Sequence, residues 1–214
     1  MDHGIAMKAV LYDWDGGNVW LFHLINNVRF EHLDSMMLLG TALGDHQLFP
    51  VYLAALSLIA VIATDRIPVA NPIRYRSQTN LWIGTLAVFS IAYLLDGLLL
   101  GVLKPLLDFP RPPLALPAGT LHIIGQPEYH HSLPSGHSSF AMLVVASIWP
   151  VSGRWSKVAG TLFVVWVGMS RISLGAHFPA DVLAGWLSSL MIVIAVRYAI
   201  ASKSRLSSMK DYTV

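Results

Sequence analysis

Long apolar runs alternate with short polar connectors along most of the chain. A transmembrane helix needs about 20 predominantly apolar residues. One run, 138–151, is shorter than this, and we expect its helix to extend into the polar flank at residues 153–156. The pattern predicts an all-α, polytopic transmembrane helical bundle with five spans, in the apolar runs 47–64, 80–103, 138–151, 158–172 and 180–201.

The amino-terminal part, residues 18–40, mixes apolar and charged side chains and does not follow this pattern. Its helical spacing i, i+3, i+4, i+7 indicates an amphipathic helix at the level of the lipid headgroups. The alternative is a sixth span, which the charged residues make costly. Neither a repeat nor a cleavable signal peptide is evident, so residues 1–214 are expected to form a single integral membrane domain. The apolar face consists of Leu21, Leu24, Ile25 and Val28.

The composition supports a membrane protein and excludes several chemistries. The chain is 55% hydrophobic and 12% charged, whereas soluble domains are about 25% charged. Without cysteine, it has no disulfides, thiolate metal sites or cysteine nucleophiles. The formal net charge is +2, and the basic residues are scattered through the connectors. We therefore expect no nucleic-acid partner.

Lysine and arginine are unevenly distributed between alternate connectors, which predicts the orientation of the chain. Short cytoplasmic loops carry the excess of these residues. The five-span prediction places the connector 104–137 and the turn 171–180 on the extracytoplasmic face, with the C-terminus in the cytoplasm. The basic residues on the predicted cytoplasmic face are Arg66, Arg74, Arg76, Arg154, Lys157, Lys203, Arg205 and Lys210.

Ionisable residues mark the ends of four apolar runs. Lys104 follows the second run and His137 precedes the third. Arg171 lies at the end of the fourth run and His177 precedes the fifth. Successive spans cross in opposite directions, so all four residues are predicted at the same face of the membrane. Because ionisable side chains that interrupt or border apolar spans are energetically costly, we interpret the cluster as a functional site.

The cluster contains side chains suited to binding a phosphoryl group and reacting with it. Arginine binds phosphate oxygens through a planar fork, and lysine acts as a point charge. Ser135 and Gly136 precede a helix whose N–H groups can bind an anion. Of two histidines, one can attack phosphorus while the other protonates the leaving oxygen. Asp181 follows His177 by four residues and can accept a proton from its imidazole.

Three motifs resemble the signature of the type 2 phosphatidic acid phosphatase (PAP2) superfamily. They are K-x6-R-P at 104–112, P-S-G-H at 134–137 and S-R-x5-H-x3-D at 170–181, each without a substitution. The resemblance implies His177 as nucleophile, Asp181 as its partner and His137 as general acid. It also implies no metal or other cofactor. The implied phosphate ligands are Lys104, Arg111, Ser135, Gly136 and Arg171.

The membrane-bound bacterial branch of that family implies a lipid phosphate or diphosphate substrate in the inner membrane, with no obligatory protein partner. An amphipathic amino-terminal segment before five spans is similar to some undecaprenyl diphosphate phosphatases, so this substrate ranks first. Phosphatidylglycerol phosphate, phosphatidate and lipid A are the alternatives. A lipid phosphotransferase, or a transporter of phosphorylated solutes, is a further alternative. The chain lacks the internal symmetry that is common in transporters.

Other polar residues have competing interpretations. His122, His130 and His131 lie near His137, but they lack the spaced partners of a metal site, so we expect exposed loop histidines. Asp96 lies inside the second run, where a functional role and a structural hydrogen bond to a neighbouring helix are equally open.

Overall fold

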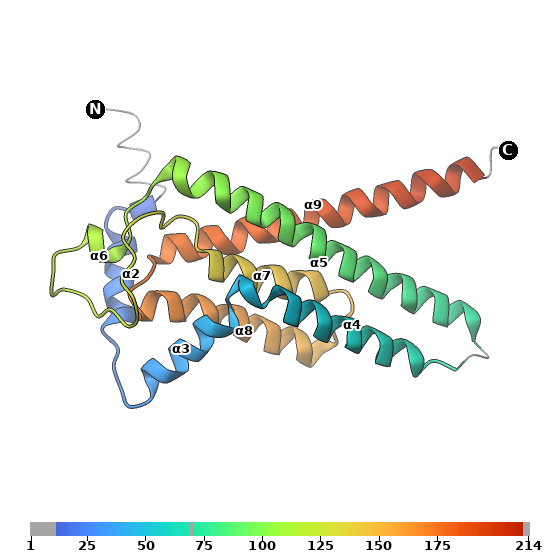
Figure 1. The fold of residues 1–214 in the computed structure, drawn as a ribbon, viewed down its shortest axis with the longest axis horizontal. Helices are drawn as coiled ribbons and strands as arrows, with labels where there is room; N and C mark the ends of the chain where they lie inside the picture. The colour runs from blue at the N-terminus through green and yellow to red at the C-terminus, as the bar shows by residue number, and fades with distance from the viewer. Residues whose placement is uncertain (1–11, 69–70, 212–214) are drawn as a thin grey trace.

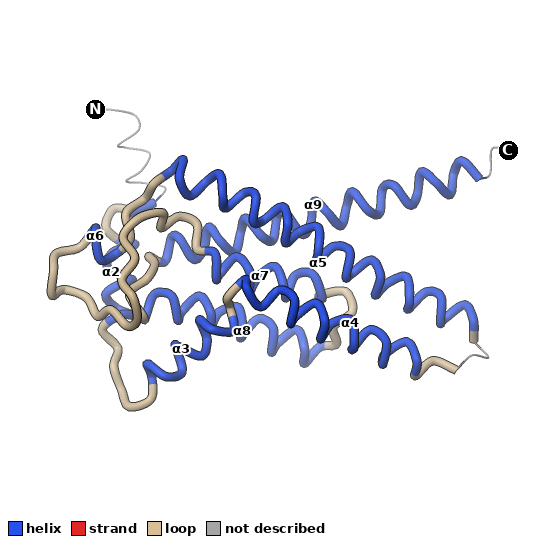
Figure 2. The backbone as a smooth tube through the Cα atoms, in the orientation of Figure 1, coloured by secondary structure: helices blue, strands red, loops and turns tan. Residues whose placement is uncertain are grey.

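The computed structural model describes residues 12–68 and 71–211. Within this part of the chain all regular structure is helical, and the longer loops gather at one end of the molecule (Figure 2). The helices are α2 (Gly17–Asn26), α3 (Leu33–Leu43), η2 (His46–Leu48), α4 (Phe49–Asp65), α5 (Pro72–Leu107), α6 (Pro112–Ala115), α7 (Gly136–Ile148), α8 (Arg154–Ser173) and α9 (Pro179–Asp211).

Helix α7 lies in the interior of the bundle, packed against α5, α8 and α9 (Figure 1). Its Phe140 and Leu143 are buried among apolar side chains of the surrounding helices. This packing buries most of α7 and places its start beside the first turns of α9, where the N–H of Ser135 donates to the carbonyl oxygen of Asp181. The main core consists of Leu56, Val88, Phe89, Ala92, Phe140, Leu143, Val144, Val193 and Val196.

The helical segments His46–Asp65, Pro72–Ala115 and Pro179–Lys203 are long and apolar enough to cross a membrane. They correspond to three of the five predicted spans. Many of their large apolar side chains point outward, including Leu58, Leu98 and Ile194. Exposed apolar surface on this scale suits a bilayer. The other two predicted spans are α7, with 13 residues, and α8, with 20 residues.

Two predictions about helix boundaries were wrong. The third helix does not extend into residues 153–156, because α7 ends at Ile148 and α8 begins at Arg154. Pro150, in the turn between them, has no N–H with which to continue the helix. The polar stretch before the second span is not all connector. Helix α5 begins at Pro72, where the side chain of Asn71 accepts a hydrogen bond from the N–H of Arg74.

The amino-terminal segment forms two helices, α2 and α3, instead of the single helix predicted over 18–40. Helix α2 lies across the end of the bundle (Figure 1), in contact with α8 and α9. Its buried side chains are Asn18, Phe22 and Asn26, whereas Leu24 and Val28 of the predicted apolar face are exposed. The polar side chains of Asn18 and Asn26 therefore face the protein.

Candidate active site

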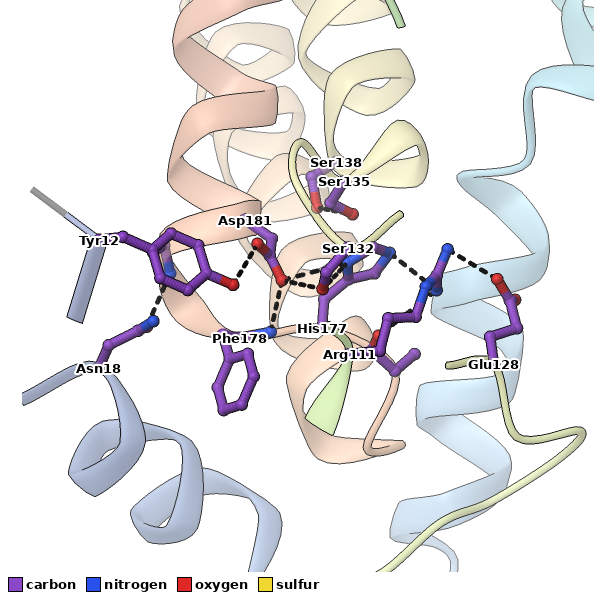
Figure 3. A network of polar contacts seen from close by, with 12 residues as sticks. Tyr12, Asn18, Arg111, Glu128, Ser132, Ser135, Ser138, His177, Phe178 and Asp181 are labelled. Atoms are coloured by element: carbon purple, nitrogen blue, oxygen red, sulfur yellow. Dashed lines mark hydrogen bonds and ion pairs between the residues drawn. The ribbon is translucent and has the colours of Figure 1, made fainter. Parts of the chain in front are cut away.

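The first turn of α9 places a carboxylate at the end of the bundle. The Asp181 side chain lies three residues after Phe178 and accepts a hydrogen bond from its N–H at 2.8 Å. This is the reach-back half of a capping box, and it orients the carboxylate toward the loop before the helix. Asp181 is fully buried. Its Oδ2 also accepts a hydrogen bond from the Ser132 hydroxyl at 2.5 Å (Figure 3).

His177 lies between this carboxylate and an arginine. Its Nδ1 is 3.4 Å from Asp181 Oδ2, and its Nε2 is 3.3 Å from Arg111 Nη1 (Figure 3). Only 1% of the residue is exposed. Burial, together with the positive charges of Arg111, Arg171 and Lys104, holds the pKa of His177 well below its ordinary value. The imidazole is therefore neutral near pH 7 and has a lone pair available for nucleophilic attack.

Arg111 holds together several parts of the loop at this end. It is 5% exposed, and its Nε donates to the carbonyl oxygen of His130 at 2.9 Å. Its Nη2 forms an ion pair with the half-exposed Glu128 at 2.7 Å (Figure 3). The Arg111 guanidinium thus contacts Glu128 at the surface and His177 in the interior. Its planar set of N–H donors suits the binding of an anion.

A cavity of about 280 Å³ opens beside this cluster, and both Arg171 and His137 line it. Arg171 donates to the Thr41 hydroxyl, and its buried Nε has no hydrogen-bond partner among the residues that the structure describes. An unpaired buried donor is costly. The Lys104 carbonyl lies 3.1 Å from His131 Nδ1, so this end of α5 reaches the same loop.

Ser135 and Gly136 form the start of α7 in the same region. The N–H of Ser135 donates to the Asp181 carbonyl oxygen at 3.0 Å and is therefore not free for a phosphate, contrary to our expectation. The first N–H groups of α7, beginning at Gly136, have no partner within the helix. They remain the helix-start donors that can face an anion.

Sequence reasoning missed two residues of the cluster. Ser132 is fully buried between His177 and Asp181, outside the three motifs. Tyr12 lies far from them in the sequence, yet its hydroxyl donates to Asp181 Oδ1 at 2.9 Å. Neither residue belongs to a periodic pattern, so the sequence carried no signal for them.

The exposed-loop interpretation of the other histidines is confirmed. His122 is exposed, and His130 and His131 are largely exposed beside Asp108. Over residues 12–68 and 71–203, no group of three or more His, Asp or Glu side chains is arranged to hold a metal ion.

Asp96 forms the hydrogen bonds to neighbouring helices that its structural interpretation requires. Its oxygens accept hydrogen bonds from Ser139 Oγ at 2.7 and 2.8 Å, and Oδ1 also accepts from Ser189 Oγ at 2.8 Å. These hydroxyls belong to α7 and α9, so the buried carboxylate links three helices beneath the site.

Comparison with known proteins identifies relatives of this chain. The lipid A 1-phosphatase of Rhizobium johnstonii is 31% identical over 130 residues, which cover 57% of this chain and 52% of that protein. The chain thus spans about half the length of this relative. The undecaprenyl-diphosphatase of Sulfolobus acidocaldarius is 26% identical over 175 residues, covering 80% of this chain and 73% of that protein.

Two solved structures share the fold. Aquifex aeolicus LpxE superposes with a TM-score of 0.65 at 24% identity, covering 84% of this chain and 93% of that one. A transmembrane PAP2-type phosphatidylglycerolphosphate phosphatase from Bacillus subtilis gives 0.67 at 20% identity, covering 92% of each. The sequence model of the PAP2 superfamily matches residues 85–205, which contain all three motifs. This match spans more than half of the chain, and we conclude that the chain belongs to the PAP2 superfamily.

Proposed function

We propose that this protein is a membrane phosphatase that removes phosphate from a lipid phosphate or diphosphate through a phosphohistidine intermediate. The observation that carries the proposal is the position of His177, with Nδ1 toward Asp181 and Nε2 toward Arg111. The nitrogen that faces the cations is the one an anionic phosphoryl group reaches. The nitrogen on the other side faces the carboxylate that stabilises a positive imidazole.

In the first step, the lone pair of His177 Nε2 attacks phosphorus as the bond from phosphorus to the leaving oxygen breaks. His137, at the edge of the cavity, protonates that oxygen. The phosphohistidine keeps its proton on Nδ1, beside Asp181. In the second step, water gives a proton to His137 and its oxygen attacks phosphorus. Inorganic phosphate leaves, and the lone pair returns to His177.

The cations are proposed to bind the phosphate oxygens and to neutralise the charge that spreads over them in the transition state. Arg111 is paired with Glu128 in this structure, so the phosphate replaces or joins that carboxylate. Arg171 has a buried Nε to which no described residue forms a hydrogen bond. The proposed phosphate ligands are Lys104, Arg111, Arg171, Gly136 through its N–H, and Ser135 through its hydroxyl, because the Ser135 N–H is bonded to Asp181.

We further propose that α7 and α8 also cross the membrane, as an inner hairpin, which gives five spans in one domain over residues 1–214. At the start of α8, Arg154 packs over the ring of Trp155, and Lys157 packs over the ring of Trp149 in the turn after α7. Basic and aromatic side chains are typical of the cytoplasmic interface. The site then faces the extracytoplasmic side of a bacterial inner membrane, with the C-terminus in the cytoplasm.

Undecaprenyl diphosphate is the first proposed substrate, supported by the undecaprenyl-diphosphatase relative, whose match extends over 80% of this chain. The lipid A 1-phosphatase relative and the Bacillus subtilis fold neighbour make lipid A and phosphatidylglycerol phosphate the alternatives. Phosphatidate completes the panel of substrates to test.

The test measures phosphate release from these four lipids by detergent-purified protein, with a chelator present. We expect release from at least one lipid and a loss of about 10⁴-fold or more in the His177→Ala variant. The matched control is His122→Ala, in the exposed loop, with unchanged release. Turnover retained by His177→Ala would exclude this nucleophile. Labelled phosphate transferred to a second lipid instead of water would favour a phosphotransferase.

A further inference from the structure

The carboxylate of Asp181 is held on both oxygens, by different parts of the chain. Oδ2 accepts from the Ser132 hydroxyl and the Phe178 N–H, and it faces His177. Oδ1 accepts from the hydroxyl of Tyr12 at 2.9 Å (Figure 3). Tyr12 precedes α2, outside the region that matches the family model. The amino-terminal segment thus reaches the residue directly behind the proposed nucleophile.

A second contact ties the same segment to the same turn of α9. The side-chain oxygen of Asn18 accepts a hydrogen bond from the N–H of Ala180 at 3.0 Å. This N–H belongs to the first turn of α9, which has no partner inside the helix. Asn18 is 1% exposed, so the bond is sheltered from water. A side chain from α2 therefore supplies part of the cap of α9, one residue before Asp181.

The environment of Tyr12 favours a neutral phenol that donates its proton. Burial, and the negative charge of Asp181 next to it, raise the pKa of Tyr12 above its ordinary value. The ring packs against Phe109, with the ring centroids 4.3 Å apart, and meets Phe178 edge to face at 6.4 Å. These contacts hold the ring in place, so the hydroxyl meets the carboxylate at little cost in conformational entropy.

We propose that Tyr12 is a positioning residue of the active site, which orients the Asp181 carboxylate so that Oδ2 faces His177 Nδ1. This inference rests on the phosphohistidine function proposed above. A carboxylate that accepts a hydrogen bond on Oδ1 is fixed in rotation, and its charge is stabilised. Without that donor the carboxylate rotates more freely and holds a proton more strongly, and it stabilises the imidazolium-like phosphohistidine less.

The test compares Tyr12→Phe with Tyr52→Phe in the purified, full-length protein. Tyr12→Phe removes the hydroxyl and keeps the ring that packs on Phe109. Tyr52 is the matched control, because its hydroxyl also donates within the protein, at 2.9 Å to the backbone oxygen of Leu43. Steady-state kinetics on the best lipid substrate are measured across pH, together with the rate of phosphoenzyme formation after rapid quench and the unfolding temperature.

We expect Tyr12→Phe to lower kcat by about tenfold or more, with little change in KM. Phosphoenzyme formation should slow by the same factor, and the acid limb of the pH profile should move to higher pH. Tyr52→Phe should change stability alone. A Tyr12→Phe variant with wild-type kcat and pH profile, or one that loses only stability, would overturn the inference while the proposed function stands. A wild type that forms no phosphoenzyme with any lipid would overturn both.

Discussion

Replacement of Asp181 by asparagine tests the charge behind His177 with little change of shape. The carboxylate accepts donors on both oxygens, whereas an amide keeps only one acceptor. Oδ2 accepts from the Ser132 hydroxyl and the Phe178 N–H, whereas within residues 12–68 and 71–203 the donor to Oδ1 is the hydroxyl of Tyr12. A hydroxyl can rotate and accept instead of donating, so the amide NH₂ should take the Oδ1 position. The fold should survive, with a change of about 1 kcal/mol in the free energy of unfolding.

The catalytic cost follows from the distance between the two groups. His177 Nδ1 and Asp181 Oδ2 are 3.4 Å apart. At an effective dielectric constant of about 20, two unit charges at that distance attract each other by about 5 kcal/mol. The imidazole becomes positive only as it bonds to phosphorus, so this attraction acts mainly on the transition state and the intermediate. At about 1.4 kcal/mol per tenfold change, Asp181→Asn should lower kcat by about 10³-fold.

The assay is single-turnover formation of the phosphoenzyme, followed by steady-state release of phosphate from the same lipid. Asp108→Asn is the matched control, because Asp108 is a half-exposed carboxylate beside loop histidines and away from His177. It should leave kcat within about twofold of wild type. If Asp181→Asn also stays within about threefold of wild type while folded, the carboxylate does not stabilise the charge on His177, and our reading of the site is wrong.

Two further predictions concern stability. The pKa of His177 lies well below its ordinary value of 6.5, so the unfolded chain takes up this proton first as the pH falls. The unfolding temperature should therefore decline as the pH falls below about 6.5, and it should decline less steeply in the His177→Gln variant. Equal slopes of unfolding temperature against pH in the two proteins would contradict the lowered pKa of His177. At Gly185, an added Cβ would lie 2.5 Å from the backbone oxygen at the start of α7, whereas at Gly97 no atom lies within 4 Å. In chemical unfolding, Gly185→Ala should lower the free energy of unfolding by about 2 kcal/mol. Gly97→Ala should leave it unchanged or raise it by up to about 1 kcal/mol. Equal effects at the two glycines would contradict the close approach of α7 and α9.

The apolar runs of the sequence predicted where the long helices lie, but their ends depend on local chemistry. Hydropathy treats Arg74 and Arg76 as connector, yet they fall within α5 because Asn71 caps a helix that begins at Pro72. Hydropathy also cannot distinguish a helix inside a bundle from one that faces lipid. Neighbouring helices surround α7, and the helix is short because Pro150 lies two residues after its last residue.

The residue types of the site, and their position at one end of the bundle, follow from the order of residues along the chain. Lys104, Arg111, Arg171, His137 and His177 occur in motifs at the ends of apolar runs, and the covalent order of the runs brings those ends together. The atoms that meet in the site are known from the three-dimensional packing and not from the sequence. The Tyr12 hydroxyl reaches Asp181 across 169 residues, and the Ser132 hydroxyl reaches it across 49. Such contacts depend on how helices pack and how a loop without periodicity is folded, and no local pattern of hydrophobic and polar residues encodes these features.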